Sequence, residues 1–505
     1  IIRKTCEYAN LQYPKSYQIN WNDKKVWDDI ITSPAGIFQF ESDYAFELLK
    51  RFKPSTINHL SMVNASLRPS GASYRDRLLG GEINKNPSEI IDELLKDNRG
   101  FLIFQEDVIA FLQQICGLSG SAADNVRRAI GRKQVDRLQA ALPQILEGYC
   151  EKSDKPREVA EEEAKTFLQI IEDASSYMFG YNHSTGYSMI GYTCGYFRYY
   201  YPEEFIAAYL NCANNTDDIV NGTNLAKLKG ITINNIKFGK SGAEYTVDKK
   251  NKAIYKGIAS IKFCNAQIAD ELLELSKNHY DNFVQLIADI NTKTSVDARQ
   301  LNILTGLGFF SQFGENAYLL KIIKLCNGEK KGSKTISPAL LTCKQLKKDK
   351  LESLGISDYL ARKYSEKETP KQYSGIDNIG LLSEMTTTIE NKPLSIIEQI
   401  KFEKEYLEYV VYQNPKVWRE YYIVTDFKTY KDVTKPYLTL HRISDGEDVK
   451  TKIKQGKLFK ESPFGLYSVL KVKEFTPCFK KKPINGVWTV TDETEDVLTE
   501  YEVIK

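Results

Sequence analysis

A short basic segment, Asp124–Lys133 (DNVRRAIGRK), carries the side chains of this chain that are best suited to chemistry. On a helix, Arg127 and Arg128 lie side by side, and Arg128 and Arg132 share a face because they are four residues apart. A guanidinium group can bind two phosphate oxygens at once, so this face suits a triphosphate or a phosphodiester backbone. Taken alone, however, the segment is more typical of a solvated basic helix face.

A second segment, Phe179–Tyr192 (FGYNHSTGYSMIGY), combines glycines, His183 and three tyrosines. Taken alone, this composition favours an ordinary packed helix with small residues where helices cross. The segment becomes informative only together with others.

Motifs for other chemistries are missing from the sequence. It contains no GxxxxGK[ST] phosphate loop, no GxSxG nucleophile elbow and no CxxC pair. Adjacent acids such as Asp28–Asp29 and Asp217–Asp218 point to opposite sides of a strand and do not converge on one metal ion. The four histidines lie in separate regions. We therefore predict no catalytic and no metal-binding residue in this chain.

Composition sets the general class of protein. The 505 residues predict three or four domains, and 42% hydrophobic with 27% charged residues is typical of globular protein. No apolar run approaches the roughly 18 residues of a membrane span, and a net charge of +3 is too small to diagnose a nucleic-acid partner. The chain begins with Ile1, so we expect it to be a piece of a longer protein.

The order of helical and strand patterns along the chain predicts an α+β fold, which begins with a mainly helical region. Periodic apolar residues predict helices at Asp43–Phe52, Glu106–Cys116, Val159–Tyr177 and Glu203–Leu210, the last opened by Pro202. From about Thr216 the pattern predicts two strands around a hairpin turn and then two helix-and-turn units, at Ile231–Phe238, Glu244–Val247, Ala253–Ser276 and Phe283–Ile323.

The last third of the chain changes character twice. Asn327–Lys334 is predicted to be a linker or exposed loop, and Leu394–Tyr412 an amphipathic helix ended by Asn414–Pro415. Alternation with period two then predicts short strands, the clearest at Tyr421–Asp426, Tyr437–Arg442, Gly465–Lys473 and Val487–Thr491. Strands this short and numerous predict a small barrel.

Six motifs gain weight when they are taken in order: GIFQFES (Gly36–Ser42), SLRPSG (Ser66–Gly71), FQEDV (Phe104–Val108), ADNVRRAIGRK (Ala123–Lys133), FGYNHSTGYS (Phe179–Ser188) and YYPEEFIAAYL (Tyr200–Leu210). This series resembles the fingers region of the bacterial replicative DNA polymerase III alpha subunit. AIYKGIASIK (Ala253–Lys262) and LTGLGFFSQFG (Leu304–Gly314) resemble its tandem helix-hairpin-helix region, and FEKEYLEYVVYQNP (Phe402–Pro415) resembles the segment before its OB-type barrel.

The resemblance implies five regions. They are the end of a palm-like segment (1–42), a fingers domain (43–215), a tandem helix-hairpin-helix domain of the clamp-binding type (216–326), a linker with an amphipathic helix (327–417) and an OB-like barrel (418–505). In the family, the three metal-binding aspartates of the palm lie upstream of the first motif. Mg²⁺ is therefore expected for the complete polymerase with its ligands outside this chain, and the isolated chain is expected to be inactive.

The resemblance also implies which side chains bind the nucleotide. Arg127 and Arg128 are expected to reach the triphosphate, with Lys133 and His183 nearby. Arg68 and Gln105 are expected to line the site, although a structural role is at least as plausible for each.

For DNA, two regions are implied. Gly306, Gly308 and Gly314 of the second hairpin either offer backbone N–H groups to duplex phosphates or simply form tight turns. In the barrel, 15 Lys/Arg stand against eight Asp/Glu over Trp418–Lys482, so Lys471, Lys473 and Lys480 are expected to attract single-stranded template. Five aromatic residues there could stack on bases, or pack in the core: Tyr437, Phe459, Phe464, Phe475 and Phe479.

Several departures from the family pattern indicate a divergent version, of the kind that a phage or plasmid carries. Asn182–Thr185 reads NHST where the family has NKSH, so His183 replaces a fixed positive charge. The Gly-Val-Gly of the first hairpin is replaced by Phe263–Cys264–Asn265, which removes the glycines that favour close backbone approach to a phosphate.

The leading hypothesis is part of a DNA-dependent DNA polymerase, a nucleotidyltransferase, in the cytoplasm of a bacterial or phage-infected cell. Its partners would be template-primer DNA, a dNTP and a palm segment from the same protein or another chain. The family also implies a sliding clamp, but the nearest clamp-type string, Gln399–Phe402 (QIKF), lies inside the predicted amphipathic helix. The alternative is a non-catalytic DNA-binding scaffold or split subunit derived from such a polymerase. An in-frame Asp-x-Asp upstream would favour the first hypothesis, and a start codon directly before Ile1 the second.

Overall fold

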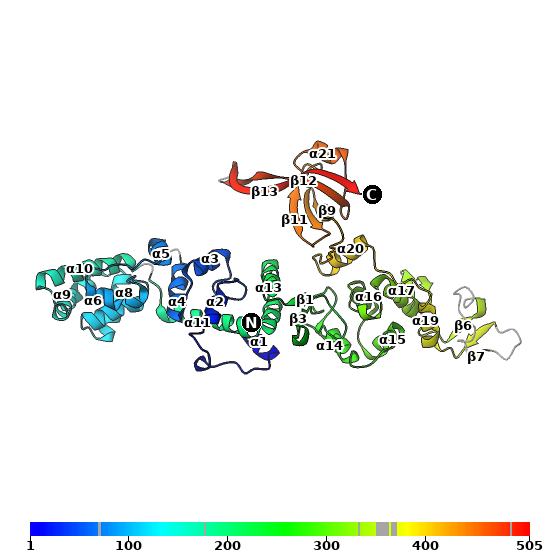
Figure 1. Ribbon diagram of the computed structural model, residues 1–505, viewed down its shortest axis with the longest axis horizontal. Helices are drawn as coiled ribbons and strands as arrows, with labels where there is room; N and C mark the ends of the chain where they lie inside the picture. The colour runs from blue at the N-terminus through cyan, green and yellow to red at the C-terminus, as the bar shows by residue number, and fades with distance from the viewer. Residues whose placement is uncertain are drawn as a thin grey trace. The chain divides into compact units, whose positions relative to one another are not determined.

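The structure is a computed structural model that describes residues 1–68, 72–175, 178–331, 334–349, 363–364, 371–484 and 487–504. Its contacts divide the chain into two compact units. Figure 1 labels the helices and strands of both. The first comprises Ile1–Ile233 with Val247–Ile254, and the second Asn234–Thr246 with Tyr255–Lys505. The first unit is mainly helical and the second combines helices with sheets, which agrees with the predicted α+β class.

The first unit contains thirteen of the labelled helices of the described chain: α1 (Ile2–Tyr8), α2 (Lys24–Ile30), α3 (Asp43–Phe52), α4 (Ile57–Ser66), α5 (Ala72–Leu79), α6 (Glu89–Leu94), α7 (Gln105–Ala110), α8 (Gly120–Gly131), α9 (Val135–Lys152), α10 (Arg157–Ala174), α11 (Tyr181–Tyr200), α12 (Pro202–Asn211) and α13 (Thr216–Leu228). α3 has the predicted bounds. It begins where Ser42 Oγ accepts a hydrogen bond from the N–H of Ala45 (3.3 Å) and ends at Lys53, whose φ of 53° lies in the left-handed region.

The helices α6 to α10 pack around an apolar core of their own. Phe111 and Phe167 lie at its centre, fully buried, with ring centroids 4.7 Å apart. Phe111 begins a π-helical turn, Phe111–Ile115, that continues α7 and completes the helix predicted at Glu106–Cys116. This core therefore positions α7 and α8, which carry the predicted phosphate-binding side chains.

A buried ion pair fastens α11 to the chain around α2. The side chain of Arg198 is fully buried and its Nε donates to Asp29 Oδ2 (2.8 Å). Its other nitrogens donate to the carbonyl oxygens of Asp29 (2.5 Å), Ser33 (2.7 Å) and Ala35 (3.0 Å). Lys229 makes a second ion pair with Asp29. A buried guanidinium needs such a full set of acceptors, so these contacts fix the long helix that carries His183.

The predicted hairpin after Thr216 is wrong in its pairing. The short strands β1 (Thr232–Asn234) and β2 (Thr246–Asp248) form at the expected places, but they are not neighbours. β3 (Ala253–Tyr255) lies between them, in a sheet of order β1-β3-β2. Sequence reasoning assigned these residues to a helix-and-turn unit, because a three-residue strand leaves too short a pattern to recognise.

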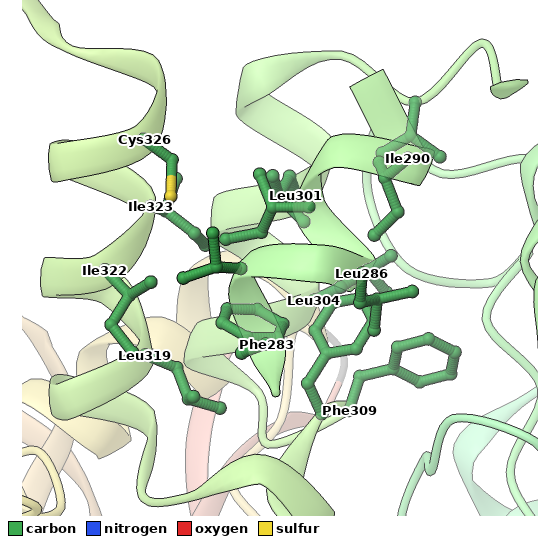
Figure 2. Packing of buried hydrophobic residues seen from close by; sticks show 14 of the residues in the cluster. Phe283, Leu286, Ile290, Leu301, Leu304, Phe309, Leu319, Ile322, Ile323 and Cys326 are labelled. Carbon is green, nitrogen blue, oxygen red and sulfur yellow. The ribbon is translucent and has the colours of Figure 1, made fainter. Parts of the chain in front are cut away.

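The second unit begins with four helices around one apolar core: α14 (Ala266–Leu275), α15 (Phe283–Lys293), α16 (Ala298–Gly306) and α17 (Asn316–Asn327). Figure 2 shows residues of these helices, among them Phe283, Leu304 and Ile322, gathered in this core. Asn265, Asn282 and Asp297 each accept a hydrogen bond from a backbone N–H at the start of a helix, which is why α14, α15 and α16 begin there.

The region predicted as a linker contains regular structure. β4 (Glu329–Lys331) pairs with β5 (Lys334–Ser337) on either side of residues 332–333, which lie outside the described part of the chain. β6 (Gln345–Lys347), β8 (Gln372–Ser374) and β7 (Lys363–Tyr364) form a further small sheet, followed by α19 (Asn378–Thr386).

The predicted amphipathic helix is real but shorter. α20 spans Ile396–Tyr406 and therefore ends well before Asn414–Pro415, where its end was predicted. The chain turns back because the buried Glu403 carboxylate accepts hydrogen bonds from the N–H groups of Val411 (2.7 Å) and Tyr412 (2.8 Å). These bonds satisfy backbone donors that a longer helix would have used internally.

The C-terminal region is a five-stranded antiparallel sheet of order β11-β10-β9-β12-β13. Its strands are β9 (Tyr421–Lys428), β10 (Tyr437–Arg442), β11 (Asp448–Lys452), β12 (Val469–Ile484) and β13 (Val487–Ile504), with α21 (Gly456–Glu461) after β11. Thr451 Oγ1 donates to the carbonyl oxygen of Asp496 (2.9 Å), so the two edge strands approach each other. In the part of the chain that the structure describes, no backbone ladder joins β11 to β13, so a closed barrel is not established.

The predicted turn at Asn485–Gly486 falls outside the described residues, although the strands on either side of it pair at Ile484 and Val487. Among the helices that the structure does describe, none has the length and apolar character to cross a bilayer.

Candidate functional site

The two predicted arginines share one carboxylate. α8 begins at Ser119, whose Oγ accepts from the N–H of Ala122 (3.3 Å), and Asp124 follows within its second turn. Arg127 donates to Asp124 Oδ1 from Nε (3.0 Å) and Nη2 (2.8 Å), and Arg128 Nη2 lies 2.7 Å from Asp124 Oδ2. The hydrogen bond from Arg127 is the main reason that the pKa of Asp124 is lowered. Spacings of three and four residues on one helix make this clamp possible.

Gln105 joins the same group from another helix. Its side-chain Oε1 accepts a hydrogen bond from Arg127 Nη1 (2.9 Å), and its backbone N–H donates to the carbonyl oxygen of Phe179 (2.9 Å). The start of α7 is held by Asp107, whose Oδ2 accepts from the N–H of Phe104 (2.7 Å). Gln105 therefore connects the arginine pair to the segment before α11, 74 residues further along the sequence.

Phe179 is the contact point for the other predicted residues. The guanidinium of Arg68 lies over its ring at 5.0 Å from the centroid, and the ring of His183, in the first turn of α11, has its centroid 5.3 Å from that of Phe179. Hydrogen bonds between α4 and α11 bring Arg68 and His183 to this place, since Ser184 Oγ donates to the carbonyl oxygen of Ser61 (2.8 Å). Five of the six predicted nucleotide-binding residues thus form one connected group, which we call the arginine cluster: Arg68, Gln105, Arg127, Arg128 and His183.

Tyr187 extends the cluster and was not singled out from the sequence. Its ring centroid lies 4.1 Å from that of His183 and 5.3 Å from that of Phe38. The signal that could have found it is the spacing of four residues between His183 and Tyr187, which places both rings on one face of a helix.

Lys133, the sixth predicted residue, lies apart from the cluster. It follows the end of α8 with a φ of 54°, in the left-handed region. It lines a hollow of about 300 Å³ together with Glu172 and Asp173 of α10 and the start of α9. No hydrogen bond or ion pair within the described residues joins Lys133 to Arg127.

The arrangement suits binding rather than bond making. Arg68, Arg127 and Arg128 carry three positive charges, and the side chain of Arg128 is 57% exposed. Two carboxylates offset part of this charge, Asp124 and the neighbouring Glu106, whose Oε2 accepts from the N–H of Tyr181 (2.7 Å). In the part of the chain that the structure describes, no three His, Cys, Asp or Glu side chains come together as they would for a metal ion. The excess of guanidinium groups is the kind of arrangement that can attract and orient a polyphosphate.

The three hairpin glycines have different surroundings. Gly306 is buried at the end of α16, where an added Cβ would lie 2.3 Å from the Phe402 ring, so close packing accounts for it. Gly314, with a φ of 143°, would place a Cβ 2.7 Å from Tyr318. Gly308 differs from both, since it is partly exposed with a φ of 84° and nothing lies within 4 Å of an added Cβ. The N–H of Gly308, however, already donates to the carbonyl oxygen of Thr305 (3.0 Å), so it closes a turn as the alternative predicted.

The predicted lysines of the C-terminal sheet separate into two places. Lys471 pairs with Glu420 (3.1 Å), and Lys473 with Glu500 (3.4 Å) and Glu502 (2.7 Å), so carboxylates offset their charge. Lys480 lines a pocket of about 580 Å³, which we call the lysine hollow, with three lysines that sequence reasoning did not single out: Lys428, Lys450 and Lys452. Carboxylates line it too, since Lys428 pairs with Asp426 (3.0 Å) and Lys452 with Glu495 (2.7 Å), and Asp496 also faces it.

The aromatic residues of this sheet differ in exposure. Phe459, Phe464 and Phe475 pack in or against its core, as the packing alternative predicted. Tyr437 and Phe479 are 47% and 62% exposed, and Tyr437 lines the lysine hollow.

Two family models match the chain. Residues 1–153 match the finger domain of the bacterial DNA polymerase III alpha subunit, and residues 230–318 match a helix-hairpin-helix motif. These matches contain the arginine cluster, apart from His183, and all three hairpin glycines.

Curated relatives agree with these models. The chain is 31% identical to the DNA polymerase III subunit alpha of Aquifex aeolicus over 304 residues, 28% to that of Ureaplasma parvum over 315 residues, and 27% to that of Bacillus subtilis over 305 residues. The alignments cover 58%, 60% and 59% of this chain but only 25%, 32% and 27% of those proteins. The chain thus matches about a quarter to a third of the length of these relatives.

Proposed function

We propose that this chain, which belongs to the family of the bacterial DNA polymerase III alpha subunits as a divergent portion, holds template-primer DNA and the incoming dNTP for a DNA-dependent DNA polymerase. The relatives are named DNA polymerase III subunit alpha, which supports a polymerase component of replication. The chain matches only about a quarter to a third of each relative, so the DNA polymerase activity of the whole protein is itself proposed.

The observation that carries the proposal is the arginine cluster. Its guanidinium groups come from two separate segments of the sequence, yet contacts through Gln105 and Phe179 bring them into one group. A triphosphate presents several anionic oxygens within a few ångströms, which suits several fixed cations better than one. When pyrophosphate leaves, negative charge grows on the leaving group, and cations held in advance stabilise it.

Metal ions would have to come from elsewhere. Polymerases of this family are expected to need Mg²⁺, but the described residues do not fit a two-metal centre because no three possible ligands converge. We propose, as the resemblance to the family implies, that the Mg²⁺ ligands lie in an upstream palm segment of the same protein or of a partner chain. No chemical step is assigned to the residues of this chain.

Nucleotide binding is tested by calorimetric titration with dATP and with inorganic tripolyphosphate as a probe of the phosphate contacts alone. Arg127→Ala is expected to weaken both by about tenfold or more, because it removes charged hydrogen bonds worth about 1.5–3 kcal/mol. Arg157→Ala is the matched control, since Arg157 is exposed and pairs with Glu147 (2.6 Å) and Glu161 (3.0 Å) away from the cluster. Equal affinity of Arg127→Ala and the wild-type protein for tripolyphosphate would show the assignment to be wrong.

DNA binding is proposed at two places, the helix-hairpin-helix region (residues 230–318) and the lysine hollow of the C-terminal sheet. The four lysines of this hollow outnumber its three carboxylates, and an exposed tyrosine lies beside them. This suits a single strand, because the remaining positive charge attracts the backbone and bases can stack. Affinity for single-stranded DNA should fall steeply with salt, and Lys450→Gln should reduce the slope by about 0.7. A salt-independent affinity would exclude this part of the proposal.

The further partners follow from the family rather than from the cluster. A palm segment would complete the catalytic centre, and a sliding clamp would keep the enzyme on DNA in a bacterial or phage-infected cytoplasm. Co-purification of this chain with the product of the adjacent upstream reading frame, followed by a primer-extension assay, tests the first of these.

A further inference from the structure

The first hairpin of the second unit contains a backbone conformation that its sequence does not favour. The N–H of Cys264 donates to the carbonyl oxygen of Ile261 (3.0 Å), which closes a β-turn. Phe263, the third residue of this turn, has a φ of 70°. A positive φ at that position is the mark of a type II turn, where glycine is strongly preferred because it has no Cβ.

The surrounding chain holds this strained turn in place. Gln300 Nε2 donates to the carbonyl oxygen of Phe263 (2.8 Å), and the N–H of Lys262 donates to the carbonyl oxygen of Tyr406 (3.1 Å). Left-handed residues other than glycine persist only where neighbours impose the conformation, and they concentrate at functional sites. The question is therefore what the side chain of Phe263 does there.

Core packing does not account for the ring. Cys264 and Tyr406, which lie beside it, pack against the apolar core of the second unit, but Phe263 does not belong to that core and is 49% exposed. The Tyr406 ring meets it edge-on at 6.5 Å. A large aromatic side chain in a strained and exposed turn costs stability without the gain of burial.

One face of the ring carries a cation. The guanidinium carbon of Arg299 lies 3.4 Å from the centroid of the Phe263 ring, a stacked geometry. Within the described residues, Arg299 has no carboxylate partner. Lys262 adds a second cation beside the ring, and its ion pair with Glu408 (3.1 Å) joins two exposed side chains, so it is weak.

We propose that Phe263 and Arg299 form a stacking site for an unpaired base of single-stranded DNA. This rests on the proposed DNA-binding function of the hairpin region and deepens it, because the hairpin would contact a base where glycines would contact a phosphate. An aromatic ring backed by a guanidinium stacks on any base, and the adjacent cations attract the backbone. Bases inside a duplex are already stacked on both faces, so the site takes unpaired bases only.

The test compares two probes with the same backbone charge. A fluorescein-labelled thymidine oligonucleotide and an abasic oligonucleotide of equal length are titrated against the 505-residue chain. Phe263→Gly is expected to weaken binding of the thymidine oligonucleotide by about fivefold or more and to leave binding of the abasic one unchanged, because one base–ring stack is lost. Phe263→Trp keeps a stacking ring and should retain the wild-type affinity for both.

A matched control separates the ring from the backbone strain. Glu408 also lies in the left-handed region, with a φ of 71°, so Glu408→Gly relieves the same kind of strain nearby while the Phe263 ring stays. Its affinity for the thymidine oligonucleotide should not fall. The melting temperature of Phe263→Gly should not fall either, since glycine suits this turn.

Three results would overturn the inference. They are an unchanged thymidine-oligonucleotide affinity in Phe263→Gly, an equal loss for the abasic probe, or a large fall in melting temperature that assigns the ring to packing. If the wild-type protein binds neither probe, the proposed DNA-binding function fails as well, which distinguishes the two failures.

Discussion

Replacing the buried guanidinium that fastens α11 should destabilise the first unit strongly. Arg198→Met keeps a side chain of similar length but removes the ion pair with Asp29 and the hydrogen bonds to the carbonyl oxygens of Ser33 and Ala35. Asp29 would remain only 5% exposed, with Lys229 as its one remaining charged partner among the described residues. Breaking a buried pair from one side costs about 3–5 kcal/mol of unfolding free energy, because the other charge stays buried.

Urea denaturation followed by tryptophan fluorescence measures this loss. The rings of Trp21 and Trp27 lie 5.4 Å and 4.6 Å from that of Tyr192 on α11, so they report on the helix concerned. A background with Trp418→Phe and Trp488→Phe removes the signal of the second unit, since the sequence has four tryptophans.

Two further variants decide whether the reasoning holds. Arg157→Met removes an arginine that is 62% exposed and should cost no more than about 1 kcal/mol. Adding Asp29→Leu to Arg198→Met should recover part of the loss, because the buried carboxylate that has lost Arg198 and keeps only Lys229 is gone. An Arg198→Met protein within about 1 kcal/mol of wild type would refute the view that this pair anchors α11.

Three further predictions concern His441 and Gly306 in the second unit and Asp124 on α8. Burial alone would lower the pKa of His441, but hydrogen bonds to Asp448 and to a backbone carbonyl (both 2.7 Å) raise it. The stability that His441 contributes is therefore complete below the ordinary histidine pKa and is lost as the pH rises through the raised value. The free energy of unfolding of His441→Gln in urea should vary less with pH across that range. Gly306→Ala should destabilise the second unit by about 1–3 kcal/mol, since its Cβ would lie 2.3 Å from an aromatic ring of α20; urea denaturation followed by the fluorescence of Trp418, in a background with Trp21→Phe and Trp27→Phe, measures this loss. The pKa of Asp124 is lowered mainly by the hydrogen bond from Arg127. The stability that this bond contributes is therefore present above the ordinary aspartate pKa and is lost as the pH falls through the lowered value. A carboxyl NMR titration of Arg127→Ala should show the pKa of Asp124 rising toward its ordinary value.

Local pattern determined the long elements of this chain well. α3 and β10 have the predicted bounds, and α10 and α12 differ from the predictions by only a few residues, because each has a clear period and a recognisable start. Elements of three residues, such as β1 to β3, have no such period, and their pairing depends on partners far along the sequence. The early end of α20 likewise depends on a buried carboxylate that no periodic pattern reveals.

The sequence alone also determined which residue types could bind phosphate, because the arginine pair and its helical spacing are visible in the printed letters. Only the tertiary structure decided which of them lie together. Contacts across long stretches of sequence bring Gln105, Phe179 and Arg68 to the arginines, whereas Lys133 lies in a separate hollow although it is only six residues from Arg127. Helical spacing fixes direction over a few residues, but the position of a side chain relative to distant segments is set by the packing of the core beneath it.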